Sequence, residues 1–193
     1  KIKVKNAAGE EEEADGLAAA LRIAGAAVKA AAEKELAAFY PPDPDGSRPI
    51  AYLWARTVRC EAPNCGAEIP LVRSFWLAKK ANRKRALRYT VKREQGQPPH
   101  LEFEVFEPKK ESELPDGTVS QARATCPCCK SVLSPDVVRH QLTQQKGGAD
   151  PIIGENGLRL GGALLLAIAT LKSGQTGRQY RLATKEDYYA CRK

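Results

Sequence analysis

The sequence predicts an α+β fold: a zinc-ribbon-like antiparallel sheet with an N-terminal helix and short C-terminal helices. Three observations support this prediction. Two close pairs of cysteines, Cys60 with Cys65 and Cys126 with Cys129, have the spacing of metal-binding turns. Apolar residues recur at three- and four-residue intervals between 15 and 39, which is typical of a helix. Several other segments alternate apolar and polar residues between turn residues, which is typical of strands.

Composition limits the classes of protein to which the chain can belong. Its 193 residues are 42% hydrophobic but only 6% aromatic, which predicts a modest aliphatic core. The net charge of +8 favours an acidic partner. We find no signal peptide, and the longest apolar run, residues 163–171, is too short to cross a membrane. We therefore expect a cytoplasmic protein with reduced thiols. The sequence contains no methionine, which suggests a fragment of a longer chain.

The sequence pattern divides the chain into three parts. They are an acidic lead and helical arm (1–46), a zinc-ribbon domain with an inserted basic hairpin (47–145), and a C-terminal loop, hairpin and short helix (146–193). In the first part, the four glutamates at 10–13 suggest a solvated lead-in. An alanine-rich apolar stripe predicts a helix over 15–39 that packs closely but weakly on another element. Prolines and Asp-Gly within 40–46 end this helix.

Strand patterns dominate the middle of the chain. Residues 51–58 and 70–78 are rich in apolar and aromatic side chains and flank the first cysteine pair. Leu87, Tyr89 and Val91 alternate with polar residues, which predicts a strand with one solvated face, and residues 101–105 repeat the pattern. Residues 118–125 lead into the second cysteine pair.

The C-terminal part contains signals for a helix, a loop and a hairpin. Ser134 followed by proline predicts a helix cap and a short helix over 136–144. Residues 145–157 are rich in glycine and polar residues and suggest a loop. Residues 163–171 and 178–183 flank a Gly-rich turn and predict a hairpin. Thr184, with Asp187 three residues later, predicts the cap of a final short helix.

The cysteine spacing predicts a metal site, and the candidate ligands are Cys60, Cys65, Cys126 and Cys129. Each pair can reach one tetrahedral zinc ion from a single turn, so two turns complete a four-sulfur site. Disulfides or unligated thiols are the alternatives. Such turns often need a positive φ after the second cysteine. Gly66 meets this need, whereas a left-handed Lys130 costs about 1 kcal/mol.

The remaining cysteines and the histidines have other interpretations. Cys128 is a spare thiol in our prediction, because the spacing from Cys126 is too short for the usual turn, although it could replace a neighbour as ligand. Cys191 suggests a small, semi-buried apolar residue on the last helix. His100 and His140 stand alone, and we expect neither to bind metal. Four sulfur ligands leave no position for water, which indicates a structural metal rather than a catalytic one.

A basic run in the middle part is the candidate nucleic-acid interface. Between 79 and 93 the chain has no acidic residue, and Trp76 and Tyr89 lie nearby, so this hairpin could follow a phosphate backbone. A solvated strand face and turn is the alternative. The candidate residues are Lys79, Lys80, Arg83, Lys84, Arg85, Arg88, Lys92 and Arg93. We find no nucleophile arrangement and no Gly-rich cofactor turn after a strand, so the chain has no predicted catalytic residue.

Several strings also resemble a known family, the zinc-ribbon adenine-specific DNA methylases. The most specific is Tyr-Leu-Trp-Ala-Arg-Thr-Val at 52–58. The strings at 39–46, 65–72, 75–80, 124–127 and 177–182 are also similar to that family. The resemblance covers about residues 17–190. It implies that the chain is an insertion between the S-adenosylmethionine-binding part and the Asp-Pro-Pro-Tyr motif of the parent enzyme. The four paired cysteines carry over as zinc ligands, with Lys130 in place of the family's usual glycine.

These observations together predict a function and an alternative. The chain is expected to be a zinc-binding segment of a DNA adenine amino-methyltransferase, not catalytic by itself, that assists binding or selection of double-stranded DNA in a restriction-modification context. Zinc would be structural, and S-adenosylmethionine would bind only the parent enzyme. The alternative is a structural or protein-interaction insert without direct DNA contact. The direction of the basic face distinguishes them: toward solvent for DNA, or covered by the chain's own acidic segments for the structural role.

Overall fold

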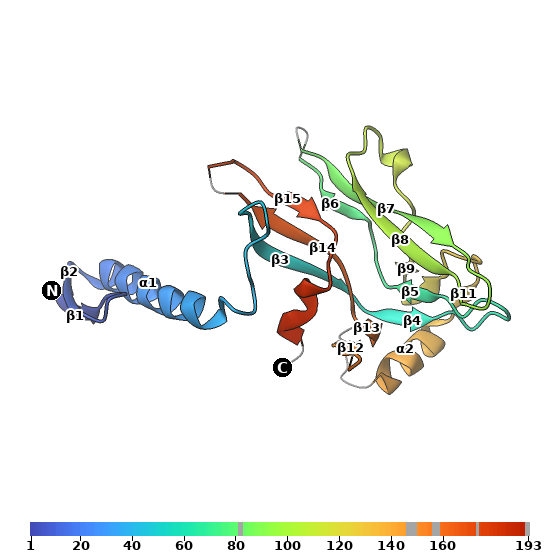
Figure 1. The fold of residues 1–193 in the computed structure, drawn as a ribbon, viewed down its shortest axis with the longest axis horizontal. Coiled ribbons are helices and arrows are strands. Elements are labelled where there is room, and N and C mark those ends of the chain that lie inside the picture. The colour runs from blue at the N-terminus through green and yellow to red at the C-terminus, as the bar shows by residue number, and fades with distance from the viewer. Residues whose placement is uncertain (81–82, 146–149, 156–158, 173, 192–193) are drawn as a thin grey trace. The chain divides into compact units, whose positions relative to one another are not determined.

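The computed structural model describes residues 1–80, 83–145, 150–155, 159–172 and 174–191, with side chains described as far as Tyr188. The described residues contain helices and small antiparallel sheets, so the mixed α+β class is confirmed. They form two compact units, Lys1–Pro42 and Asp43–Lys193, which we describe separately (Figure 1).

The first unit begins with a hairpin that the sequence analysis did not predict. Strand β1 (Ile2–Lys5) pairs antiparallel with β2 (Glu11–Ala14). The Asn6 side chain accepts hydrogen bonds from the turn backbone at Ala8 and Glu10, both 3.0 Å. Lysines of β1 lie opposite glutamates of β2, and opposite charges across strands stabilise such a pair. The glutamates at 10–13 are exposed, as the expected solvated lead-in requires, but Glu11, Glu12 and Glu13 lie in a strand that was not predicted.

Helix α1 (Leu17–Leu36) confirms the predicted helix with shorter ends. Its N-terminal part packs against the β1–β2 hairpin (Figure 1), and Ala20 is its buried residue. Most of the predicted apolar stripe remains exposed, with Leu17 and Val28 accessible to 68% and 70%. The predicted packing of this stripe is not seen among the described residues.

The second unit contains a three-stranded sheet in which a strand from the start of the unit pairs with strands from near its end. Strand β14 (Leu164–Leu171) pairs with β3 (Arg48–Ala55) on one side and with β15 (Gln179–Arg181) on the other, all antiparallel. The β14–β15 pair confirms the predicted C-terminal hairpin. Because β3 and β14 are more than 100 residues apart, this sheet ties the C-terminal segment to the start of the unit.

A second three-stranded sheet carries the basic hairpin. Its order is β6 (Trp76–Ala78), β7 (Arg85–Lys92) and β8 (His100–Phe106). Leu87, Tyr89 and Val91 lie opposite Val105, Phe103 and Leu101, so both predicted alternations are confirmed. The apolar face of this sheet packs on Phe75.

The predicted strand over 70–78 is interrupted. Strand β4 (Thr57–Arg59) pairs with β5 (Glu68–Pro70), and the chain then leaves this ladder before β6 begins. Thr118 explains the break, because its backbone N–H donates to the Val72 carbonyl and its hydroxyl accepts from the Val72 N–H. A contact with a distant segment thus replaces strand pairing here.

The segment 111–144 contains the second cysteine pair and the short elements next to it. Strand β10 (Arg123–Thr125) pairs with β9 (Val119–Ser120) and with β11 (Val132–Leu133), and η1 (Glu111–Glu113) precedes them. Helix α2 (Pro135–Gln144) confirms the predicted helix, and the Ser134 side chain caps it by accepting from Val137 N.

The predicted loop at 145–157 was partly wrong, because strand β12 (Pro151–Ile153) lies in it and pairs with β13 (Arg159–Gly162). The rest of that prediction falls largely outside the described residues. The final helix is a 3-10 helix, η2 (Glu186–Cys191). The predicted cap forms, because the Asp187 carboxylate accepts from both the backbone N–H and the hydroxyl of Thr184.

Candidate metal centre

The first cysteine turn joins β4 to β5. Cys60 follows β4 directly, and its backbone N–H donates to the Ala67 carbonyl at 2.9 Å. The Cys65 N–H donates to the Ala62 carbonyl at 3.1 Å, which closes the turn between the two thiols. Gly66 has φ +60°, the left-handed conformation expected after the second cysteine.

The second cysteine turn joins β10 to β11 and repeats this arrangement. The Cys126 N–H donates to the Ser131 carbonyl at 2.8 Å, as Cys60 does to the residue two positions after Cys65. Lys130 has φ +67°, almost the value of Gly66. The two turns differ in length but share this closing hydrogen bond and a left-handed residue after the second cysteine, which in the second turn is a lysine at a position that favours glycine.

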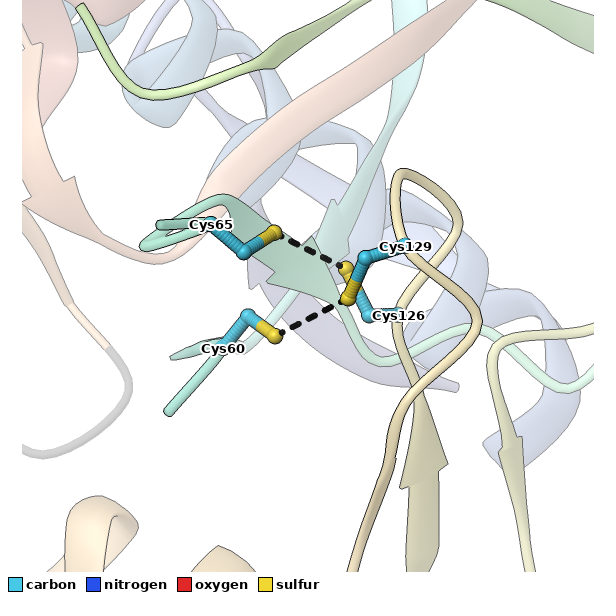
Figure 2. A group of neighbouring side chains, drawn as sticks. All are labelled: Cys60, Cys65, Cys126 and Cys129. Atoms are coloured by element: carbon cyan, nitrogen blue, oxygen red, sulfur yellow. Dashed lines mark hydrogen bonds between the residues drawn. The ribbon is translucent and has the colours of Figure 1, made fainter. Parts of the chain in front are cut away.

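The two turns bring the four predicted cysteines together. Cys60 Sγ lies 3.5 Å from Cys129 Sγ, and Cys65 Sγ lies 3.8 Å from Cys126 Sγ (Figure 2). All four sulfur atoms lie within 4.8 Å of one another. A tetrahedron with metal–sulfur bonds of about 2.3 Å has edges of about 3.8 Å, so this group fits one ion. The measured separations are far longer than the about 2.05 Å of a disulfide bond.

Burial and hydrogen bonding act differently on the thiols. Cys60, Cys65 and Cys126 are buried, whereas Cys129 is exposed. Burial raises the pKa of Cys60 and Cys65 above the ordinary thiol value. Hydrogen bonds from Ser131 lower the pKa of Cys129 to about 6, which stabilises its thiolate. A bound cation would stabilise all four thiolates, since metal ligands bind deprotonated.

The other candidate ligands lie outside this group. Cys128 is buried in the same core, and burial raises its pKa to about 11, but its sulfur is not one of the four. His100 lies in β8 and His140 in α2, and neither joins a potential metal-binding group among the described residues. The side chain of Cys191 lies outside the described part of the chain. The four grouped cysteines can thus hold a metal ion with sulfur alone.

Aliphatic residues and cysteines form the core around the sulfurs. Val58, Ala67, Ile69 and Ala124 are almost fully buried beside them, together with Leu133. The core contains no aromatic side chain among its described buried members. Because cysteine thiols take up part of this core in place of larger apolar side chains, a metal ion that joins the ligand thiols would add to the stability that aliphatic packing supplies.

Two glutamines, Gln141 in helix α2 and Gln145 directly after it, hold the open edge of β4, and the sequence analysis did not identify them. Arg59 N–H donates to Gln141 Oε1 at 2.7 Å, and Gln141 Nε2 donates back to the Arg59 carbonyl at 2.9 Å. Gln145 Nε2 donates to the Thr57 carbonyl. These amides replace a neighbouring strand along β4. Their four-residue spacing was visible in the sequence, but their partner on β4 was not.

Arg159 ties the β12–β13 hairpin to the same region. Its guanidinium donates to both carboxylate oxygens of Glu68 at 2.9 and 2.6 Å, and also to the Gly162 and Ala163 carbonyls. The Thr57 hydroxyl also lies 2.7 Å from Glu68 Oε1. The Arg159 side chain is only 12% exposed. This bidentate pair therefore fixes β5 and β13 relative to each other.

The eight predicted basic residues fall into two groups. Four form ion pairs with glutamates of the same unit: Lys79 with Glu111, Arg85 with Glu107, Arg88 with Glu104, and Lys92 with Glu102, at 3.9, 2.7, 2.8 and 3.3 Å. The other four have no carboxylate partner among the described residues. Arg83 donates to Thr176 Oγ1 and Arg93 to the Cys128 carbonyl. The backbone carbonyls of Lys80 and Lys84 accept hydrogen bonds from Arg83 and Arg85, but their ammonium groups have no partner among the described residues.

Arg93 belongs with the metal centre as much as with the basic hairpin. Its guanidinium donates to the Cys128 carbonyl at 2.8 Å, and Cys128 lies between the two ligand cysteines of the second turn. Four thiolates around a divalent cation carry a net charge of −2, so a nearby guanidinium would stabilise the loaded site. Sequence proximity alone had assigned Arg93 to the basic run.

In comparisons with known proteins, no family model, curated protein or solved structure matches the chain. Within the described residues, no helix has both the length and the apolar content that crossing a membrane requires. The four-cysteine group is therefore the feature on which a function can be built.

Proposed function

We propose that this chain is a zinc-ribbon-like structural module that binds one zinc ion through Cys60, Cys65, Cys126 and Cys129. The convergence of the four sulfur atoms from two turns that share a closing hydrogen bond supports this proposal. Zinc is the metal that most often takes four cysteine ligands in a structural site. With all ligand positions filled by sulfur, the ion would hold shape and would not activate water.

The biological setting is part of the same proposal. The resemblance in the sequence supports a place within an S-adenosylmethionine-dependent DNA adenine methyltransferase, with catalysis carried out by other parts of that enzyme. The close, reduced thiols also suit a cytoplasmic location, where cysteines persist as metal ligands. The chain itself would contribute stability and shape to the enzyme.

The arrangement of charges favours a structural or protein-interaction role for the strand face of the basic hairpin. Arg85, Arg88 and Lys92 are matched by three glutamates on or next to β8. These pairs remain partly exposed, so the face is neutralised rather than covered, and paired cations offer little net charge to a phosphate backbone.

Direct contact with double-stranded DNA is the second candidate function. It is favoured by one observation: Lys80, Arg83, Lys84 and Arg93 have no carboxylate partner among the described residues. Uncompensated cations in a short segment attract polyanions and would assist target binding by the parent enzyme.

A pair of matched cysteine substitutions tests the structural metal. Cys126→Ser removes one of the four sulfurs, whereas Cys128→Ser makes the same change at a buried neighbour outside the group. We expect the Cys126→Ser protein to lose stoichiometric zinc and cooperative unfolding, and the Cys128→Ser protein to retain one zinc per chain. Zinc content by mass spectrometry and thermal melts provide the measurement.

Two results would reject the module as proposed. One is a wild-type chain purified without chelator that contains well under one zinc ion. The other is a Cys126→Ser protein that folds and melts like the Cys128→Ser control, since the metal would then not hold the fold.

A further inference from the structure

We infer that nucleic-acid phosphates bind this protein at one end of the second unit, where the β6–β7 and β14–β15 turns meet, and not along the strand face of β7. We call this the turn-end surface. The inference rests on the second candidate function and gives it a location. The surface consists of the described residues Lys79, Lys80, Arg83, Lys84 and Arg178.

The strand face is a poor phosphate site because it neutralises itself. Arg88 donates from Nε and Nη2 to the two carboxylate oxygens of Glu104, at 2.8 and 2.9 Å. Lys92 pairs with Glu102, and Arg85 with Glu107. Three cations thus face three carboxylates, so an approaching phosphate would meet no net positive charge and three nearby anions.

The two turns are joined by Arg83. Its Nη2 donates to Thr176 Oγ1 at 3.1 Å, although the two residues are 93 positions apart in the chain. Gly177 has φ +106°, and a Cβ there would lie 1.5 Å from Arg83 Nη1, so the guanidinium rests directly on the glycine backbone. Arg178 follows Gly177 and is thereby brought beside the basic run.

The turn-end surface retains its charge. Residues 79–84 and 174–178 contain no aspartate or glutamate. Lys80 and Arg178 are exposed, and neither these two nor Lys84 has a carboxylate partner in the described part of the chain. Only Lys79 has one, a 3.9 Å contact with Glu111, whose side chain is 80% exposed. An exposed pair of this length holds the lysine weakly and leaves it available to another anion.

The chemistry of this surface suits a phosphate backbone. Lysines act as point charges toward phosphate oxygens, and the fork of a pinned arginine can bind two of them. Lys79 also lies 5.5 Å from the centre of the Trp76 ring, which places an aromatic side chain next to the cations. The segments 79–84 and 174–178 contain no large apolar residue that could insert into a bilayer, so nucleic acid fits better than a lipid surface.

Two charge-matched double variants test the location in the full, zinc-loaded chain. Lys80→Gln with Lys84→Gln removes two cations from the turn-end surface, and Arg88→Gln with Lys92→Gln removes two from the strand face. Binding to a short mixed-sequence DNA duplex is followed by fluorescence anisotropy over a series of salt concentrations. Zinc content and melting temperature are measured on the same samples.

We expect the turn-end variant to lower affinity on the order of tenfold at 0.1 M salt, and to reduce the log–log salt slope by about 2, because two phosphate contacts are lost. The strand-face variant should stay within about twofold of wild type with an unchanged slope. Equal losses in both variants would overturn the inference, since binding would then follow net charge alone.

Other outcomes separate this inference from the proposed zinc module. A zinc-loaded, folded chain that binds no duplex would overturn the turn-end surface and leave the module standing. Binding to vesicles with anionic lipid but not to the duplex would overturn it equally. A chain without zinc that binds the duplex through Lys80 and Lys84 would support the surface and reject the module.

Discussion

The metal-binding region and the β6–β7–β8 sheet belong to one compact unit but have different kinds of core. In the sheet, Phe75, Tyr89 and Phe103 pack with ring centres 5.5 to 6.4 Å apart, and Phe75 is almost fully buried. Around the cysteines the core consists of aliphatic residues and sulfur, with no aromatic ring among its described buried members. Aromatic side chains bury large areas without help, whereas a sulfur-rich core gains little until a metal joins its thiolates.

Strand length sharpens the contrast between these regions. Strands β7 and β8 have eight and seven residues and pair along seven positions. Strands β4, β5, β10 and β11 have only two or three residues each. Ladders this short are marginal in water, so their order depends on what lies at their ends. The two regions should therefore respond differently to metal removal and to core substitutions.

Metal removal should produce the largest effect and should be confined to the cysteine region. After treatment with a chelator, we expect amide protection to be lost in β4, β5, β10 and β11 while β7 and β8 remain protected. Structural zinc contributes about 10–16 kcal/mol of apparent binding free energy in small zinc peptides, which exceeds the stability of most domains. Hydrogen exchange with and without chelator provides the measurement, and equal loss in both regions would contradict the separation.

Truncation of the aromatic core should produce the reverse pattern. We expect Phe75→Ala to lower the free energy of unfolding by about 3–5 kcal/mol, because it removes a fully buried ring and leaves a cavity. Zinc content should be unchanged in the protein that remains folded. Leu160→Ala, at a side chain that is 63% exposed, is the control and should have little effect on a denaturant melt. If the folded fraction of the Phe75→Ala protein also lost zinc, the two regions would not be separable.

Arg181 should have a smaller effect that depends on pH. Its guanidinium donates to Asp43 at 2.8 and 2.7 Å and to Asp187 at 2.6 and 2.8 Å. We expect Arg181→Met to cost about 2–3 kcal/mol, less than for a fully buried pair because the arginine is partly exposed. Arg178→Met, an exposed arginine on the same hairpin, is the control in the same melts.

The pH dependence follows from Asp187. Burial acts to raise the pKa of this carboxyl, but hydrogen bonds from Arg181 and Thr184 outweigh it and leave the pKa below its ordinary value. A lowered pKa stabilises the fold above the unfolded value near 3.9, and that stability is lost as pH falls through the folded value. The difference between wild type and Asp187→Asn should therefore shrink in acid below about pH 4. A constant difference would contradict this assignment.

The smallest effect should come from Lys130 in the second cysteine turn. Lys130→Gly should stabilise the zinc-loaded chain by up to about 1 kcal/mol, because glycine adopts the φ of +67° without strain. Lys130→Ala removes the same side chain without relieving the backbone and should bring no gain. If both variants melt alike, the left-handed backbone at Lys130 does not destabilise the second turn.

Local patterns predicted much of the fold and the cysteine group. The alternation through Leu87 and Tyr89, the Ser134 cap and the paired cysteines each depend on residues close in sequence, so their structures could be anticipated. The interruption at Val72 and the glutamine contacts on β4 depend on partners far along the chain and could not. The pairing of Arg88 with Glu104 is intermediate: both strands were predicted, but the register that places them side by side was not.

The basic run shows the functional consequence of that missing register. Counted along the sequence, residues 79–93 form a stretch without acids. Once β8 lies beside β7, the cations of β7 are paired with glutamates, and the excess charge is left to the turn and to Arg93, which lies against the second cysteine turn. A one-dimensional count of charges therefore predicted a larger interface than the paired strands can offer.

X-ray absorption at the zinc edge, together with metal counting on the same sample, tests the central claim most directly. The account predicts one zinc ion per chain with a first shell of four sulfur atoms at about 2.3 Å. The Cys128→Ser protein should give the same spectrum. A shell containing nitrogen or oxygen, or a chain that folds with well under one zinc ion, would contradict the four-cysteine site formed by Cys60, Cys65, Cys126 and Cys129.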